Sequence, residues 1–409
     1  MKLSIDAIHE PAAEPTKGKA GEVFAAFLKL GVTSFGGPIA HLGYFRDELV
    51  VRRKWIDEPG YADLVALCQF LPGPASSQVG FALGLLRGGP LGAIAAWAAF
   101  TLPSAILLVI FAMAATTFEG PVGAGLLHGL KIVAVAVVAQ AVWGMAKSLT
   151  PDRERASIAL AAVLITVLAA GPAGQVTAIA VGALAGLIFC RNGAVTGTPH
   201  LSFRVPPLVG AGCLASFVLL LLGLPLVAAA VDSKGIDLFD SFYRSGSLVF
   251  GGGHVVLPLL QAEVVDPGWV TSDAFLAGYG AAQAVPGPLF TFAAYLGFVT
   301  GQEPNGIFGA VVALVAIFLP GFLLLVGVLP FWNSFRKHRM AQAAMRGANA
   351  AVVGILGAAL YSPVWTGAVL DRYDFALALT GVVLLIAWKA PPWLTVVLMA
   401  AGGVLLELL

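Results

Sequence analysis

Lys29-Leu-Gly-Val-Thr-Ser-Phe-Gly-Gly-Pro38 returns in the second half of the chain as Arg244-Ser-Gly-Ser-Leu-Val-Phe-Gly-Gly-Gly253. A second motif, Gln69-Phe-Leu-Pro-Gly-Pro74, returns as Gln283-Ala-Val-Pro-Gly-Pro288. The copies begin 215 and 214 positions after the originals. So constant an offset between two unusual motifs indicates an internal duplication. Both motifs interrupt helices, and they do so inside apolar sequence.

The composition is that of a membrane protein. Of the 409 residues, 59% are hydrophobic and 11% are charged, and the mean hydropathy is +0.91. A soluble domain carries roughly 25% charged residues. Several apolar runs reach the roughly 20 residues that a helix needs to cross a bilayer, and they are too continuous for a β-barrel. We therefore predict an all-α polytopic protein in the inner (plasma) membrane, in contact with lipid. The net charge of +1 does not indicate nucleic-acid binding.

The longest polar stretch divides the chain into two halves. We expect about thirteen hydrophobic helical segments, separated near the middle by the turn-rich residues 191–207. The first twenty residues are polar and show no signal peptide. The expected division is a disordered lead at 1–20, a first repeat at 21–190, a linker with a connecting transmembrane helix at 191–237 and a second repeat at 238–409.

The charges of the loops predict an inverted repeat. The two repeats start an odd number of segments apart, which inverts the second one. The loop between the two motifs is rich in Arg and Lys in the first repeat (Arg46–Lys54) and acidic in the second (Glu263–Asp266). Basic loops favour the cytoplasm, and both loops lie on the favoured side if each motif segment enters the membrane and returns. We therefore expect broken or re-entrant helices, with a coincidence of loop charge as the alternative.

Pro72-Gly73-Pro74 can create an anion site inside the membrane. Each proline costs a helix about 3 kcal/mol or more, and a broken helix survives in lipid only where it lines a cavity or packs on protein. A helix restarting at Pro74 would present the free N–H groups of Ala75–Ser77 and a positive dipole end, which attract anions. Ser76, Ser77 and Gln78 supply further donors, and Gln69 would close the other side.

Phe35-Gly36-Gly37-Pro38 suggests a related role. Its glycines allow a ligand or another backbone to approach closely, Pro38 restarts the helix, and Ser34 adds a hydroxyl. The alternative is that both motifs are only kinks for helix packing. Duplication of both motifs at one offset favours a substrate site.

The two copies differ in polarity. Leu289–Phe292, after the second Pro-Gly-Pro, is far less polar than Ala75–Gln78, and Gly253-His254 replaces Pro38-Ile39. We infer that the first repeat binds the substrate more directly and that the second completes the cavity. His254 would then carry a proton or make a buried polar contact.

The scarcity of carboxylates in the apolar segments favours an anionic substrate. Lys29 and Arg244 occupy matching positions, and a cation inside the membrane indicates function unless it reaches the interface. An intramembrane enzyme is the disfavoured alternative, because the six histidines show no paired spacing and the three cysteines are scattered. We expect no catalytic residue, metal or cofactor.

The motifs resemble those of the chromate ion transporter family of bacteria and archaea. The resemblance rests on Phe35–Pro38, the Glu48–Trp55 stretch, Pro72–Pro74, and the repeats Phe250–Gly252 and Pro286–Pro288. It covers nearly the whole chain, in the two-domain form of the family, and departs from the pattern at Gly253, where a proline would match the first copy.

The resemblance implies a secondary transporter that exports chromate from the cytoplasm and confers chromate resistance. Sulfate is a similar tetrahedral dianion, so an anion channel and an uptake carrier for sulfate-like oxyanions are the alternatives. A proton, a counter-anion and a homodimer are compatible partners. The expected substrate-binding residues lie in the motifs and their copies: Lys29, Ser34, Gly36, Gly37, Pro38, Gln69, Pro72, Gly73, Pro74, Ser76, Ser77 and Gln78, with Arg244, Gly251, Gly252, His254, Gln283, Pro286, Gly287, Pro288 and Thr291.

Overall fold

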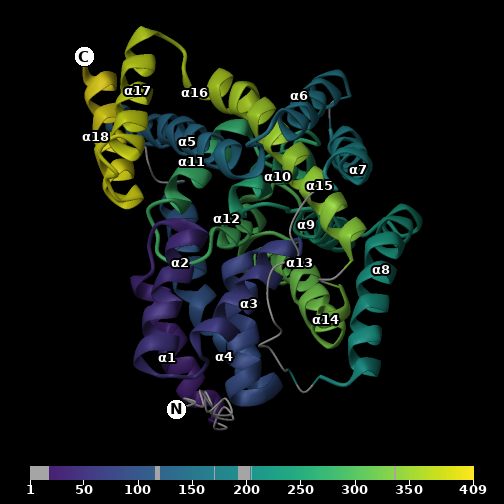
Figure 1. Ribbon diagram of the computed structural model, residues 1–409. Coiled ribbons are helices and arrows are strands. Elements are labelled where there is room, and N and C mark those ends of the chain that lie inside the picture. The colour runs from purple at the N-terminus through teal and green to yellow at the C-terminus, as the bar shows by residue number, and fades with distance from the viewer. Residues whose placement is uncertain (1–17, 116–119, 170, 192–202, 204, 336–337) are drawn as a thin grey trace, which may run out of the picture.

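The computed structural model describes residues 18–115, 120–169, 171–191, 203, 205–335 and 338–409, and this part of the chain is helical without a β-strand (Figure 1). The first half forms α1 (Ala20–Thr33), α2 (Gly37–Phe45), α3 (Glu58–Phe70), α4 (Ala75–Ala115), α5 (Gly120–Leu149), α6 (Arg153–Leu168) and α7 (Pro172–Phe189). The helix α8 (Pro207–Ala230) connects it to the second half. The expected disordered lead, up to residue 17, and most of the polar stretch before α8 lie outside the described residues.

The second half repeats this order of elements. Its helices are α9 (Lys234–Ser247), α10 (Val256–Val264), α11 (Ser272–Ala282), α12 (Phe292–Val299), α13 (Gly306–Val328), α14 (Trp332–Phe335), α15 (Arg339–Ala359), α16 (Thr366–Ala368), α17 (Arg372–Ile386) and α18 (Pro392–Leu408). Short π-helical stretches (Arg46–Arg52, Leu360–Trp365) and 3₁₀ turns (Gly253–Val255, Leu289–Thr291, Leu329–Phe331) join some of them.

Six helices of the described chain are long and apolar enough to cross a membrane. They are Ala75–Ala115, Gly120–Leu149, Pro172–Phe189, Pro207–Ala230, Gly306–Phe335 and Arg339–Ala368. This number is smaller than the expected count of hydrophobic segments because the motifs divide four segments and other helices are short. The predicted all-α polytopic architecture with two repeats is confirmed.

The motif segments are pairs of half-helices, as expected. The 14 residues of α1 extend about 21 Å, which is less than the roughly 30 Å of a bilayer core. Gly89, at φ 64°, ends the first part of α4 after a similar length. The two repeats even share a cap position: the Asp57 side chain accepts from the Gly60 N–H at the start of α3, and that of Thr271 accepts from the Ala274 N–H at the start of α11.

The two repeats exchange helices. The long α5 of the first repeat packs against α17 and α18 of the second, and α15 of the second packs against α6 and α7 of the first. Gly125 and Gly129 meet Gly403 at one crossing, and Gly347 meets Gly182 and Gly186 at the other. Without Cβ atoms the backbones come close enough for dense van der Waals packing, which holds helices together where lipid removes the hydrophobic effect.

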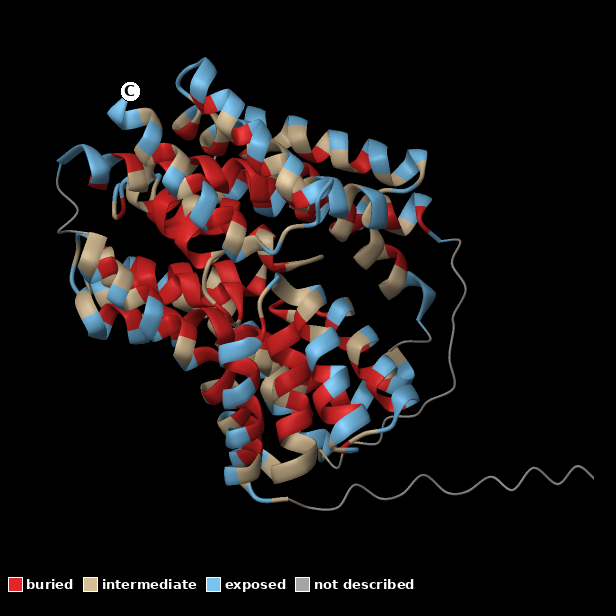
Figure 2. Ribbon diagram, turned by 90° about the vertical axis from the view of Figure 1, so that its left-hand side faces the viewer, coloured by how far each residue is buried: buried red, intermediate tan, exposed pale blue. Residues whose placement is uncertain are grey.

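Burial follows the same arrangement. Figure 2 shows buried residues gathered inside the bundle and exposed residues on its outward faces. One apolar cluster combines residues of α4, α5, α9–α13, α15, α17 and α18, so it belongs to both repeats. The second joins α1, α3 and the start of α4 to the end of α13. Neither repeat therefore has a core of its own.

Gly129→Ala tests this interpretation of the helix exchange. A Cβ at Gly129 would collide with the backbone of Met399 and Ala400 in α18, and overpacking of this kind costs about 1–3 kcal/mol. We expect a melting temperature in detergent several degrees below that of the unmodified protein.

Gly144→Ala is the matched control, because nothing lies within 4 Å of a Cβ at that position of the same helix. It should leave the melting temperature unchanged or slightly raised. Equal losses in the two variants would contradict close packing at the crossing.

Candidate functional site

Each Pro-Gly-Pro motif is bonded to the opposite repeat. The Gly73 N–H donates to the Val249 carbonyl at 2.7 Å, and the Gly287 N–H donates to the Ser34 carbonyl at 2.9 Å. Ser34 and Val249 occupy equivalent positions, one residue before each Phe-Gly-Gly. The four interrupted segments thus meet through a reciprocal pair of backbone hydrogen bonds. The amides of Gly73 and Gly287, two of the expected substrate-binding residues, therefore bind carbonyls of the protein.

The geometry of this contact requires glycine. Gly73 has φ +117° and Gly287 has φ +101°, values that side chains disfavour. A Cβ on Gly73 would lie 3.1 Å from the Gly321 Cα, and one on Gly287 would lie 3.1 Å from the Ser104 Oγ. Both positions therefore require glycine, because a side chain would disfavour the turn and would block the close approach of the neighbouring segment.

The N-terminus of α4 lies at this contact. The helix begins when the Pro74 carbonyl accepts from the Gln78 N–H at 2.9 Å. The N–H groups of Ala75–Ser77 then have no acceptor within the helix. The Gln78 side chain donates to the carbonyls of Pro72 and Gly321, both at 2.9 Å. Gln78 thereby fixes the start of α4 against α13.

Four buried residues at the two helix breaks of the first repeat form a serine–histidine cluster: Ser34 at the C-cap of α1, His41 in α2, and Ser76 and Ser77 in the first turn of α4. The His41 Nδ1 lies 3.4 Å from the Ser76 Oγ, and the Ser34 backbone lies beside the imidazole. The Ser34 Oγ, the His41 Nε2 and the Ser77 Oγ have no hydrogen-bond partner among the described residues. Buried polar atoms are rarely left unpaired, so these groups can bind a ligand.

The equivalent position in the second repeat is closed. Thr291, which matches Ser77, accepts from the Ser104 Oγ at 2.8 Å and donates to the Pro288 carbonyl at 2.7 Å. Ser104 follows Pro103 in a Leu-Pro-Ser sequence, and the matching Leu-Pro-Gly ends at Gly321. The first repeat thus has a glycine, Gly321, at the position that supplies the hydroxyl of Ser104 to Thr291 in the second. This difference leaves the Ser77 hydroxyl free.

The two predicted cations are paired with carboxylates of their own repeats. The Lys29 Nζ lies 2.7 Å from Glu48, and the Arg244 Nε lies 3.3 Å from Glu263. The Lys29 side chain is 48% exposed. Glu48 and Glu263 are themselves equivalent positions, so the pair is duplicated with the motifs. Each pair closes the hairpin of half-helices around a Phe-Gly-Gly turn.

The surroundings of these pairs differ in charge. Arg52 and Arg53 also bind Glu48, at 3.0 and 2.8 Å, whereas Arg244 is shared with a second carboxylate, Asp240, at 2.5 Å. Burial would raise the pKa of Glu48, but hydrogen bonds from Lys29 and Arg53 hold it at about 2. Burial raises the pKa of Glu263 to about 7 against the effect of its single cation. The first pair thus has excess positive charge and the second does not.

Four further predicted residues, Gly37, Pro38, Gln69 and His254, have different surroundings. The two Phe-Gly-Gly motifs meet, since a Cβ on Gly253 would lie 3.4 Å from Pro38 and one on Gly37 would lie 4.0 Å from the His254 Nε2. The His254 Nδ1 is 2.8 Å from the Tyr279 hydroxyl, so this histidine has a buried polar contact. Gln69 lies on an exposed face of α3; Gln78 makes the contacts across the break.

Sequence reasoning missed four residues of this region: His41, Ser104, Tyr279 and Asp240. Ser104 could have been found, because Leu-Pro-Ser and Leu-Pro-Gly are a third duplicated motif. His41, Tyr279 and Asp240 belong to no duplicated motif. The partners of His41 and Tyr279 lie in distant segments of the chain, and the partner of Asp240 lies one helical turn further along α9.

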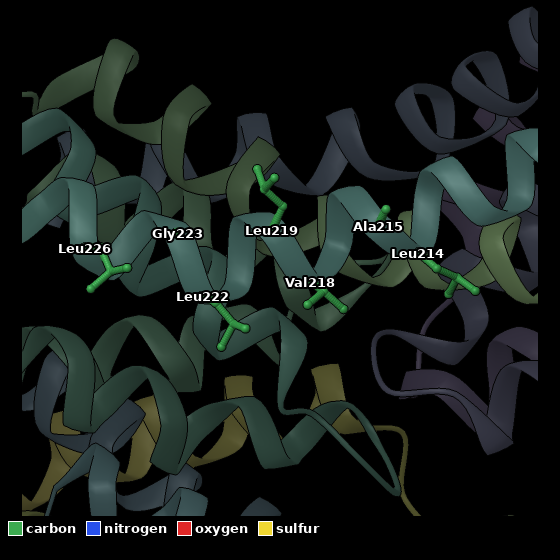
Figure 3. A pocket seen from close by; sticks show the side chains of 7 residues that line it. All are labelled: Leu214, Ala215, Val218, Leu219, Leu222, Gly223 and Leu226. Atoms are coloured by element: carbon green, nitrogen blue, oxygen red, sulfur yellow. The ribbon is translucent and has the colours of Figure 1, made fainter.

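An apolar groove lies elsewhere on the described structure and lacks hydrogen-bond donors. It has a volume of about 710 Å³ and follows α8, lined by Leu214, Ala215, Val218, Leu219, Leu222, Gly223 and Leu226 (Figure 3). Side chains of this kind suit lipid chains and offer nothing to an oxyanion. Among the described residues no group of three His, Cys, Asp or Glu side chains could hold a metal ion.

Comparison with known proteins agrees with the duplicated architecture. A family model described as chromate transporter matches residues 21–187 and 236–405. The chain is 31% identical to a probable chromate transport protein of Synechococcus elongatus, with 93% of each chain covered. It is 29% identical to chromate transport proteins of Pseudomonas aeruginosa and Cupriavidus metallidurans, over 93% of this chain and 90% and 91% of theirs. No solved structure matches. With its two matched repeats, the chain belongs to the chromate transporter family.

Proposed function

We propose that this protein is a secondary transporter that moves chromate out of the cytoplasm across the inner membrane and so confers chromate resistance. Relatives that the chain matches over 93% of its length are named as chromate transport proteins. Sulfate has the same shape and charge and is the natural competitor for the site.

The observation that carries the proposal is the set of unpaired donors at the N-terminus of α4. The hydroxyls of Ser34 and Ser77 are buried and without partners among the described residues, and Ser77 itself lies in the first turn of α4, whose N–H groups have no acceptor within the helix. Together with the helix dipole they can replace part of the water shell of an oxyanion. No carboxylate belongs to this cluster, which suits an anion and not a cation.

The charge difference between the repeats supports export. Glu48 with Lys29, Arg52 and Arg53 leaves positive charge at one hairpin, and Asp240 with Glu263 and Arg244 leaves negative charge at the other. A cytoplasmic position of the first hairpin would attract an anion from inside. The membrane potential then assists its exit, since a dianion leaving a cell that is negative inside gains about 4.6 kcal/mol per 100 mV.

Reconstituted protein tests the activity. We expect chromate flux in liposomes that saturates with concentration and is stimulated by counter-substrate. The flux should accelerate when the compartment that chromate leaves is electrically negative. Flux that never saturates and has a far higher turnover would indicate a channel. Absence of chromate flux in protein that binds lipid and melts cooperatively would exclude the proposal.

The serine of the open site can be compared with its closed counterpart. Ser77→Ala removes an unpaired hydroxyl, whereas Thr291→Ala removes one that is already bonded within the protein. A hydrogen bond to a charged group contributes about 1.5–3 kcal/mol, so Ser77→Ala alone, or with Ser76→Ala, should weaken chromate binding by about tenfold or more.

Thr291→Ala should change affinity much less, although it leaves Ser104 without its partner. Equilibrium binding of chromate, with melting temperature recorded for each variant, separates the two effects. Equal losses of affinity would contradict an asymmetric site.

An inverted arrangement of the two hairpins makes a topological prediction. Because the half-helices are too short to cross the bilayer, the loop at Arg46–Lys54 should be cytoplasmic and the loop near Asp266 external. Single cysteines in each loop, labelled from one side with an impermeant reagent, should react from opposite sides. The reverse pattern would mean that the motif segments cross the membrane fully.

A further inference from the structure

The buried imidazole of His41 is the remaining unexplained group of the serine–histidine cluster. It is 1% exposed, and its ring packs edge-to-face on Phe100 with centroids 5.3 Å apart. One nitrogen faces the Ser76 hydroxyl, and the other, Nε2, is buried without a hydrogen-bond partner among the described residues. An imidazole with one unpaired nitrogen, between the Ser76 hydroxyl and the Ser34 backbone, is a buried polar group that lacks one partner.

The missing partner has a definite chemistry. In the tautomer that donates from Nδ1 to Ser76, Nε2 is an acceptor and needs an O–H or N–H group. Protonated at Nε2, the same nitrogen donates to an anionic oxygen. Chromate can satisfy either form, because its conjugate acid, hydrogen chromate, exists near neutral pH. Sulfate stays a dianion there and brings no proton.

We propose that His41 is a specificity residue that binds chromate together with one proton, held between Nε2 and an oxyanion oxygen. One proton from solvent and one chromate dianion enter the site, and no bond to chromium is made or broken. The charge that enters the apolar interior is thereby one unit instead of two, which lowers the cost of desolvation. Sulfate is a much weaker base than chromate and does not hold the shared proton near neutral pH, so it enters as a dianion at the larger desolvation cost. This inference rests on the proposed function, because it concerns how that site distinguishes two oxyanions.

The charged groups near α2 have partners of their own. This helix packs against α4 and the Arg46–Arg52 stretch and carries one further titratable residue, the exposed Tyr44. The neighbouring groups are paired as follows: Arg87 with Glu22, Arg46 with Asp47 and Glu58, Arg52 and Lys29 with Glu48, and the Tyr61 hydroxyl with the Leu42 carbonyl. The other histidine that faces α2 is His254, whose Nε2 would lie 4.0 Å from a Cβ on Gly37 and whose Nδ1 is 2.8 Å from the Tyr279 hydroxyl. Within the serine–histidine cluster, His41 is the group that can exchange a proton with the ligand.

Proton uptake by the unmodified protein gives the first test and needs no variant. In weakly buffered detergent solution at about pH 8, addition of chromate should remove about one proton from solvent for each anion bound, and sulfate should remove none. Equal proton counts for the two anions would overturn the inference. Binding of neither anion would contradict the proposed function instead.

Variants then assign the proton to His41. His41→Asn places an amide near the position of Nδ1, and His41→Gln places one near the position of Nε2. Neither side chain can carry the proton. We expect both to lose the proton uptake and to reduce the preference for chromate over sulfate by about tenfold, with sulfate binding largely kept. His128→Gln is the matched control, since that histidine lies outside the motifs with its Nε2 2.7 Å from the Asp374 carboxylate, and the selectivity of this variant should stay unchanged. Persistent proton uptake in either His41 variant that melts normally would show that the proton lies elsewhere.

Discussion

The structure depends on the reciprocal backbone hydrogen bonds from Gly73 to Val249 and from Gly287 to Ser34. A helix broken in lipid leaves N–H and C=O groups that water cannot satisfy. Each Pro-Gly-Pro break solves this problem with the carbonyl that precedes the other repeat's Phe-Gly-Gly. Neither break can therefore be stable without the opposite repeat. The duplication is a structural necessity of this arrangement as well as a record of the chain's history.

The same dependence recurs at the level of whole helices. The exchange of α5 and α15 makes each repeat complete the packing of the other, and the buried apolar residues form a cluster across both. Small residues at the crossings allow this in a bilayer, where close packing replaces the hydrophobic effect. A motif contact at the centre and helix exchange at the periphery give the two halves one common fold.

Function depends on where the symmetry fails. Ser104 bonds to Thr291 in the second repeat, but Gly321 offers Ser77 no hydroxyl in the first. Lys29 and Arg244 are equivalent, yet their carboxylate surroundings differ in number and charge. We propose that these differences give a nearly symmetric scaffold one anion site and a preferred direction of transport. His41, which matches Val256 in the second repeat, is part of the same asymmetry.

The sequence by itself determined the membrane class, the duplication and the positions of the helix breaks, because these depend on composition and on proline and glycine along one chain. It also showed that the Pro72–Gln78 copy is the more polar one. The tertiary structure decided which of those groups are free. It paired the Gly73 amide, Lys29 and Arg244 with partners, placed Gln69 on an exposed face and brought His41 to Ser76. Hydrogen-bond satisfaction depends on neighbours from distant segments, and no pattern along the chain specifies them.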